Sequence, residues 1–94
     1  MAAYCIAQIE VTNLDEYMKY ASQTVASAEK FGGKFLVKGG KAEWLEGTGS
    51  DRNVVVEFES VEAAKAWYTS DEYQKILPIA LANSKRSLVL VEGV

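Results

Sequence analysis

The chain has 94 residues, of which 49% are hydrophobic and 24% charged, and its formal net charge at pH 7 is −3. This length and composition predict a single globular domain over residues 1–94. No cluster of lysines and arginines is present to neutralise phosphates, so we expect neither nucleic acid nor an anionic membrane as a partner. No apolar run reaches the roughly 20 residues of a membrane span, and the N-terminus lacks a secretion-signal pattern. We therefore expect a cytoplasmic protein.

The first part of the chain predicts a strand followed by a helix. Residues 4–11 (YCIAQIEV) contain β-branched and aromatic residues without Gly or Pro, which indicates a strand. Asn13 with Glu16 three residues later is a capping-box-like helix start. Apolar residues then recur at helical spacing until Gly32-Gly33, and glycine is the usual residue just past a helix C-terminus.

Two further strands are predicted in the middle of the chain. Residues 34–38 (KFLVK) predict the second strand, which Gly39-Gly40 interrupts. We expect this strand to continue over residues 42–46 (AEWLE) after a bulge or turn. Residues 54–59 (VVVEFE) predict the third strand, after a polar loop.

A broken helix and a last strand complete the pattern. Ser60 is the expected N-cap of one helical piece, and Ser70 that of a second. Pro78 is expected to weaken or bend the second piece. Residues 87–92 (SLVLVE) predict the fourth strand.

The resulting order, β-α-β-β-α-β, predicts an α+β ferredoxin-like fold with an antiparallel sheet and helices on one face. Three strands read as apolar runs rather than as alternating patterns, namely residues 35–37, 54–56 and 88–91. A sheet that is apolar on both faces needs cover on both, and the predicted helices cover only one. We therefore expect a homodimer that buries the second face by two-fold symmetry, the alternative being a monomer with shielding loops.

The absence of histidine limits the possible chemistry. It excludes a His-ligated haem, a His-based zinc site and a Ser-His-Asp triad, and we expect neither a metal nor another cofactor. The single cysteine, Cys5, cannot form an internal disulfide. It is either a small core residue or a nucleophile, and the sequence places no acid or base beside it.

The candidate polar site residues are Glu57, Arg52 and Lys38. Glu57 lies between apolar neighbours in residues 54–59, on the face of Val55. A buried carboxylate there would have a raised pKa and act as a catalytic acid or base. The alternative is a solvent-facing carboxylate or one paired with Arg52 or a lysine. Arg52 or Lys38 is the candidate for holding an anionic group.

Aromatic residues supply a candidate apolar wall. Trp67, Tyr68 and Tyr73 surround the expected break between the two helical pieces, and we expect Tyr17 and Tyr20 on the first helix to face them. Amphipathic aromatic side chains around a cleft suit a small, partly apolar ligand. Plain core packing is the alternative.

Taken together, these segments resemble the family catalogued as domain of unknown function 1330, in the dimeric α/β-barrel superfamily. The residues that carry the resemblance extend over nearly the whole chain and are most specific between Phe58 and Gln74: Tyr17, Tyr20, residues 32–40, Glu46-Gly47, Arg52, residues 56–60, Ala63-Ala64, residues 66–68, residues 70–74 and residues 91–93. The resemblance implies a homodimer with facing sheets. Members of this family often have arginines where this chain has Lys38 and Ala80.

Two functional hypotheses follow. The first is a protein that binds or converts a small organic molecule in a pocket between sheet and helices. As an enzyme it would resemble the cofactor-independent monooxygenases or the isomerases of related dimeric barrels. The second is a non-catalytic homodimer that senses a ligand or regulates a partner.

Overall fold

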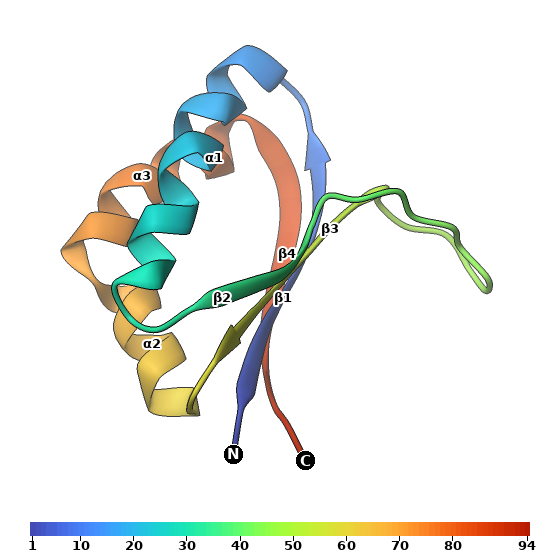
Figure 1. The fold of residues 1–94 in the computed structure, drawn as a ribbon. Coiled ribbons are helices and arrows are strands. Elements are labelled where there is room, and N and C mark those ends of the chain that lie inside the picture. Colours follow the sequence, from blue (N-terminus) through green and yellow to red (C-terminus); the bar gives the residue numbers. More distant parts are fainter.

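The structure, a computed structural model that describes residues 1–94, contains a four-stranded antiparallel sheet and three helices. The elements are, in chain order, β1 (Ala3–Val11), α1 (Leu14–Glu29), β2 (Lys34–Lys38), β3 (Arg52–Phe58), α2 (Val61–Thr69), α3 (Asp71–Ala82) and β4 (Ser84–Glu92). The strands lie side by side in the order β2-β3-β1-β4. All three helices cover one face of the sheet, and the other face is open (Figure 1). The predicted ferredoxin-like fold is confirmed.

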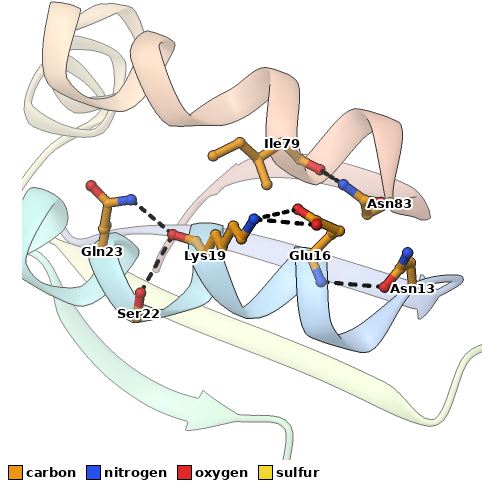
Figure 2. Close-up of polar contacts among 7 residues, drawn as sticks. All are labelled: Asn13, Glu16, Lys19, Ser22, Gln23, Ile79 and Asn83. Atoms are coloured by element: carbon orange, nitrogen blue, oxygen red, sulfur yellow. Dashed lines mark hydrogen bonds and ion pairs between the residues drawn. The ribbon is translucent and has the colours of Figure 1, made fainter.

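Helix α1 begins and ends at the predicted signals. The Asn13 side chain accepts a hydrogen bond of 3.3 Å from the backbone N–H of Glu16 (Figure 2). Lys19 forms an ion pair of 2.9 Å with Glu16 on the solvent side of the helix (Figure 2). At the other end Gly32 has φ = +79°, a conformation that residues with a Cβ rarely adopt.

The second helical region is divided at Ser70, as predicted. Ser60 caps α2, and its Oγ accepts a 3.1 Å hydrogen bond from the N–H of Ala63. The Ser70 Oγ accepts from the N–H of Tyr73 at 3.2 Å and donates to the carbonyl of Trp67 at 2.7 Å. Ser70 thus joins the end of α2 to the start of α3. Pro78 lies inside α3, which continues past it to Ala82.

We expect Ser70→Ala to lower the free energy of unfolding by about 1 kcal/mol, because the N-cap of α3 loses its acceptor. Ser70→Asp keeps an acceptor for the N–H of Tyr73 and should retain most of that stability. Urea unfolding followed by circular dichroism measures both variants. Equal stability of Ser70→Ala and the parent protein would contradict the capping role.

The strand predicted over residues 42–46 is absent, which corrects the sequence analysis. The β2–β3 ladder ends where Lys38 pairs with Val54, and Gly39 then turns with φ = +71°. Residues 39–51 leave the sheet as a long arm directed away from the helices (Figure 1). No neighbouring strand pairs with residues 42–46.

Strands β3 and β4 begin earlier than predicted because both pair with β1. Ile9 of β1 lies opposite Arg52 of β3 on one side and opposite Arg86 of β4 on the other. This register brings two arginines to the same end of the sheet, on the face of the buried Ile9.

The open face of the sheet carries one wholly apolar row across all four strands. The register aligns, from edge to edge, Val37, Val55, Ile6 and Val89. Val37 is 40% exposed and Val89 53% exposed. This row is the uncovered apolar surface that the sequence predicts. None of the three helices has the length and apolar character needed to cross a membrane.

Candidate functional site

A pocket of about 400 Å³ lies between the sheet and α1. It exists because β1 presents small side chains to the core: Ala3, Cys5 and Ala7 precede Ile9 on the buried face. The side chains of α1 therefore do not fill the space between the helix and this part of the sheet. Exposed residues of α1 and β2, Met18 among them, also line the pocket, which places its mouth between these two elements.

Two arginines without acidic partners occupy one end of this pocket. Arg52 and Arg86 both line it, and neither takes part in an ion pair. The Nε of Arg52 and one Nη of Arg86 are shielded from solvent and have no hydrogen-bond partner. Lys38 adds a third positive charge to the lining. Because buried donors of a charged group are costly to leave unpaired, this end of the pocket suits an anionic group.

Tyrosines of α1 hold the two guanidinium groups in place. Arg86 donates a hydrogen bond of 3.3 Å to the hydroxyl of Tyr20 and lies 5.2 Å from the centre of its ring. Arg52 lies 5.8 Å from the ring centre of Tyr17. Behind them the hydroxyls of Tyr20 and Tyr73 share a hydrogen bond of 2.9 Å. These contacts orient the cations and leave their charge unneutralised.

Tyr17 and Tyr73 remain neutral at physiological pH. Burial raises the pKa of Tyr17, and burial together with the neighbouring Tyr20 raises that of Tyr73. Neither phenol therefore supplies a negative charge to the arginines.

Trp67 forms a rigid part of the pocket wall. Its indole N–H donates to the Oγ of Ser27 at 3.1 Å, and its ring packs 4.3 Å from that of Tyr73 and 5.5 Å from that of Phe58. With its only polar atom satisfied inside the protein, the ring offers the pocket an apolar surface.

Cys5 lies on the pocket floor as a protonated thiol. It is only 4% exposed, and burial raises its pKa to about 11. The thiolate is the reactive form, so this environment favours the core alternative over the nucleophile.

We expect Cys5 to react slowly with iodoacetamide at pH 7 and the rate to rise about tenfold per pH unit up to pH 10, because the thiolate fraction rises in that way below a pKa of about 11. Mass spectrometry of the alkylated chain measures the rate. A plateau below pH 9 would mean that the thiol is activated.

Of the predicted site residues, the structure brings Arg52, Lys38, Trp67 and Tyr20 together around the pocket. Tyr73 lies behind Tyr20 and does not line it. Tyr68 instead lines a second, smaller hollow beside α2.

Glu57 lies outside the pocket, and its expected place as an acid or base there is corrected. It belongs to the open face of the sheet, where it accepts a 3.1 Å hydrogen bond from the hydroxyl of Tyr4. That hydrogen bond and the charge of Glu57 raise the pKa of Tyr4. The buried Val56 and Phe58 take the helix-covered face, so strand alternation turns Glu57 away.

Arg86 was missed by sequence reasoning, whereas Tyr17, which was expected to face the aromatic group together with Tyr20, lines the pocket. The signal for Arg86 was its spacing, two and four residues before Leu88 and Leu90, which places all three on one face of a strand. Ala80, where the family resemblance leads one to expect an arginine, is fully buried and does not line the pocket. The pocket nevertheless contains two arginines, one from β3 and one from β4.

No group of three or more acidic or cysteine side chains lies close enough together to hold a metal ion. The charged groups that line the pocket are arginine and lysine side chains, which bind anions rather than cations.

The fold and pocket define a ferredoxin-like α+β domain with a cationic pocket under its helices. The chain belongs to the family described as domain of unknown function DUF1330, whose model matches residues 2–94. No curated protein matches the chain.

Solved structures of the same fold extend over almost the whole chain. A protein of unknown function from Rhodopseudomonas palustris is 16% identical, with a TM-score of 0.81 over 99% of this chain and 82% of that one. A dimeric ferredoxin-like protein of unknown function from Jannaschia sp. CCS1 is 14% identical, with a TM-score of 0.80 over 99% and 100%. A cofactor-independent oxygenase from Streptomyces nogalater is 12% identical, with a TM-score of 0.70 over 99% and 93%. At these identities the likeness shows a shared fold.

Proposed function

We propose that this protein is a homodimer in which each protomer binds a small organic anion in the pocket between sheet and helices. The observation that carries the proposal is the pair of unneutralised arginines, Arg52 and Arg86, whose buried N–H groups lack partners at one end of the pocket. A carboxylate placed there would accept hydrogen bonds from both, and charge-assisted bonds of this kind are the strongest that a protein offers to an anion.

The rest of the pocket suits an apolar body attached to that carboxylate. Phe35, Val54, Val56 and Trp67 line it. A volume of about 400 Å³ is within the range of pockets that bind small organic ligands. The arginines would fix the orientation of the ligand, and the apolar walls would supply most of the buried area.

The open sheet face supports the dimer. Leaving the row of Val37, Val55, Ile6 and Val89 in water forgoes a large hydrophobic contribution, since each side chain is worth about 1.5–3 kcal/mol when fully buried. A second copy that packs on this face by two-fold symmetry buries the apolar row of both protomers. The arm of residues 39–51 extends toward the same side (Figure 1). Its Leu45 is 87% exposed. The dimeric protein from Jannaschia shares this fold.

Binding without turnover is favoured over proton-transfer catalysis. The pocket lining contains no carboxylate, the chain has no histidine, and the Cys5 thiol is protonated at neutral pH. No residue is therefore poised as a general base. This arrangement fits a ligand-sensing homodimer.

A second candidate is conversion of a substrate acidic enough to lose its proton to water before it binds, so that the pocket needs no general base. The two guanidinium groups would stabilise an enolate or phenolate oxygen, as preorganised donors stabilise developing negative charge. The cofactor-independent oxygenase from Streptomyces nogalater provides a fold-level precedent.

The test is a thermal-shift screen of organic acids against their matched amides. We expect acids to raise the melting temperature by several degrees at saturating concentration and amides to leave it unchanged, because only the acids pair with the arginines. Acids that bind are then assayed for oxygen uptake and product formation, which separates conversion from sensing. Equal shifts for acids and amides would contradict an anion site.

A further inference from the structure

A second hollow of about 300 Å³ adjoins the pocket, between α2 and strands β1 and β4. The two spaces share Cys5 and Leu88, which lie on β1 and β4. Leu90 and Ala64 also line the second hollow. Cys5 and Leu88 therefore form part of the boundary of both spaces.

The stretch of β1 that the two spaces share carries small side chains on its buried face. Ala7 pairs with Leu88 and Cys5 with Leu90, so the floor from the arginine end onward consists of small β1 residues beside two leucines of β4. Both leucines face the helices, yet both are only partly buried. Ile9, between the two arginines, is four residues from Cys5, a distance of about 13 Å along a strand.

The inner wall of the second hollow is made of apolar or small side chains, namely Cys5, Ala64, Leu88 and Leu90, whereas Lys65 and Tyr68 line it from exposed positions of α2. The Thr69 hydroxyl donates to the carbonyl of Lys65 at 2.8 Å. Tyr68 presents an aromatic ring packed 5.4 Å from that of Tyr73. An apolar segment is therefore the occupant that this space favours.

We propose that the ligand is an elongated acid, an inference that rests on the proposed anion site. Its carboxylate binds Arg52 and Arg86, and its apolar chain runs along β1, over Cys5 and Leu88, into the second hollow. The small residues of β1 and Ala64 of α2 then determine how long a chain the protein accepts.

The experiment is calorimetric titration with straight-chain carboxylic acids of increasing length, from butanoate to decanoate. Burial of each added methylene should raise the affinity about fourfold, until the second hollow is filled. In Ala64→Leu, which fills that hollow, the rise should stop at shorter acids while butanoate binds as in the parent protein. Ala66→Leu, on the exposed side of α2, is the matched control and should behave like the parent.

Leu90→Phe provides a second blocking variant at a partly buried position, in case Ala64→Leu does not fold. Decanoate with a terminal diazirine tests the parent protein without mutation, and should label residues 64–69 of α2. Labelling confined to α1, or an affinity that rises identically in parent and blocked proteins, would overturn the elongated-acid proposal. In that case short acids would still bind and the anion site would stand. Failure of every acid to bind would instead refute the anion site itself.

Discussion

Replacing Arg86 with methionine should weaken the binding of benzoate about 10- to 100-fold. Hydrogen bonds to a charged group are worth about 1.5–3 kcal/mol, and the variant removes the donors that β4 contributes to the anion site. Methionine keeps much of the side-chain volume, so the pocket wall remains. NMR titration with benzoate measures the change, and benzamide, which has the same shape without the charge, should bind the two proteins alike.

The stability of the Arg86 variant distinguishes a binding role from a structural one. In Arg86→Met the protein loses the 3.3 Å hydrogen bond to Tyr20 and the contact with its ring, which lowers stability. It also loses a buried donor that has no partner, which raises stability. These effects oppose each other, so the free energy of unfolding should stay within about 1 kcal/mol of the parent value. Arg86→Lys keeps the charge without the planar fork and should bind benzoate with intermediate affinity. Parental affinity in Arg86→Met would contradict the assignment.

Val89→Lys should convert the dimer into a monomer at micromolar concentration. Val89 lies in the apolar row of the open face, and two-fold symmetry places the new charge in the interface twice. Each buried, unpaired charge costs several kcal/mol, which raises the dissociation constant of the dimer at least about 1,000-fold. Sedimentation velocity measures the oligomeric state.

Leu81→Lys is the matched control for the dimer prediction. Leu81 is 60% exposed, close to the 53% of Val89, but it lies on α3, on the helical side of the molecule. Its substitution should leave the dimer intact. A monomeric parent protein, or loss of the dimer in both variants, would show that the open face is not the interface.

Most of the fold could be predicted from the sequence because its local signals agree with its tertiary structure. Asn13, Ser60 and Ser70 each cap a helix where the pattern predicts one. The prediction of a strand over residues 42–46 was wrong because a strand requires a neighbouring strand to pair with as well as a suitable sequence. Local sequence contains no information on whether the ladder continues beyond Gly39.

The site was harder to predict because it depends on pairing between distant strands. Arg86 follows Ser84 and Lys85, a polar stretch that reads as a loop, and only its pairing opposite Ile9 places it in the sheet. For Glu57 the alternation was clear, but Val54-Val55-Val56 is apolar on both faces, so the sequence does not show which face the helices cover. Arg52 and Lys38 could be named as candidates because their charges lie next to apolar residues in the sequence.

The most direct test of the account observes the arginine side chains themselves. In ¹⁵N NMR spectra, saturating benzoate should shift the side-chain N–H resonances of Arg52 and Arg86, because their unpaired donors gain an acceptor, whereas benzamide should leave both in place. Benzoate that binds while both guanidinium resonances stay unchanged would place the anion elsewhere and contradict the site described here.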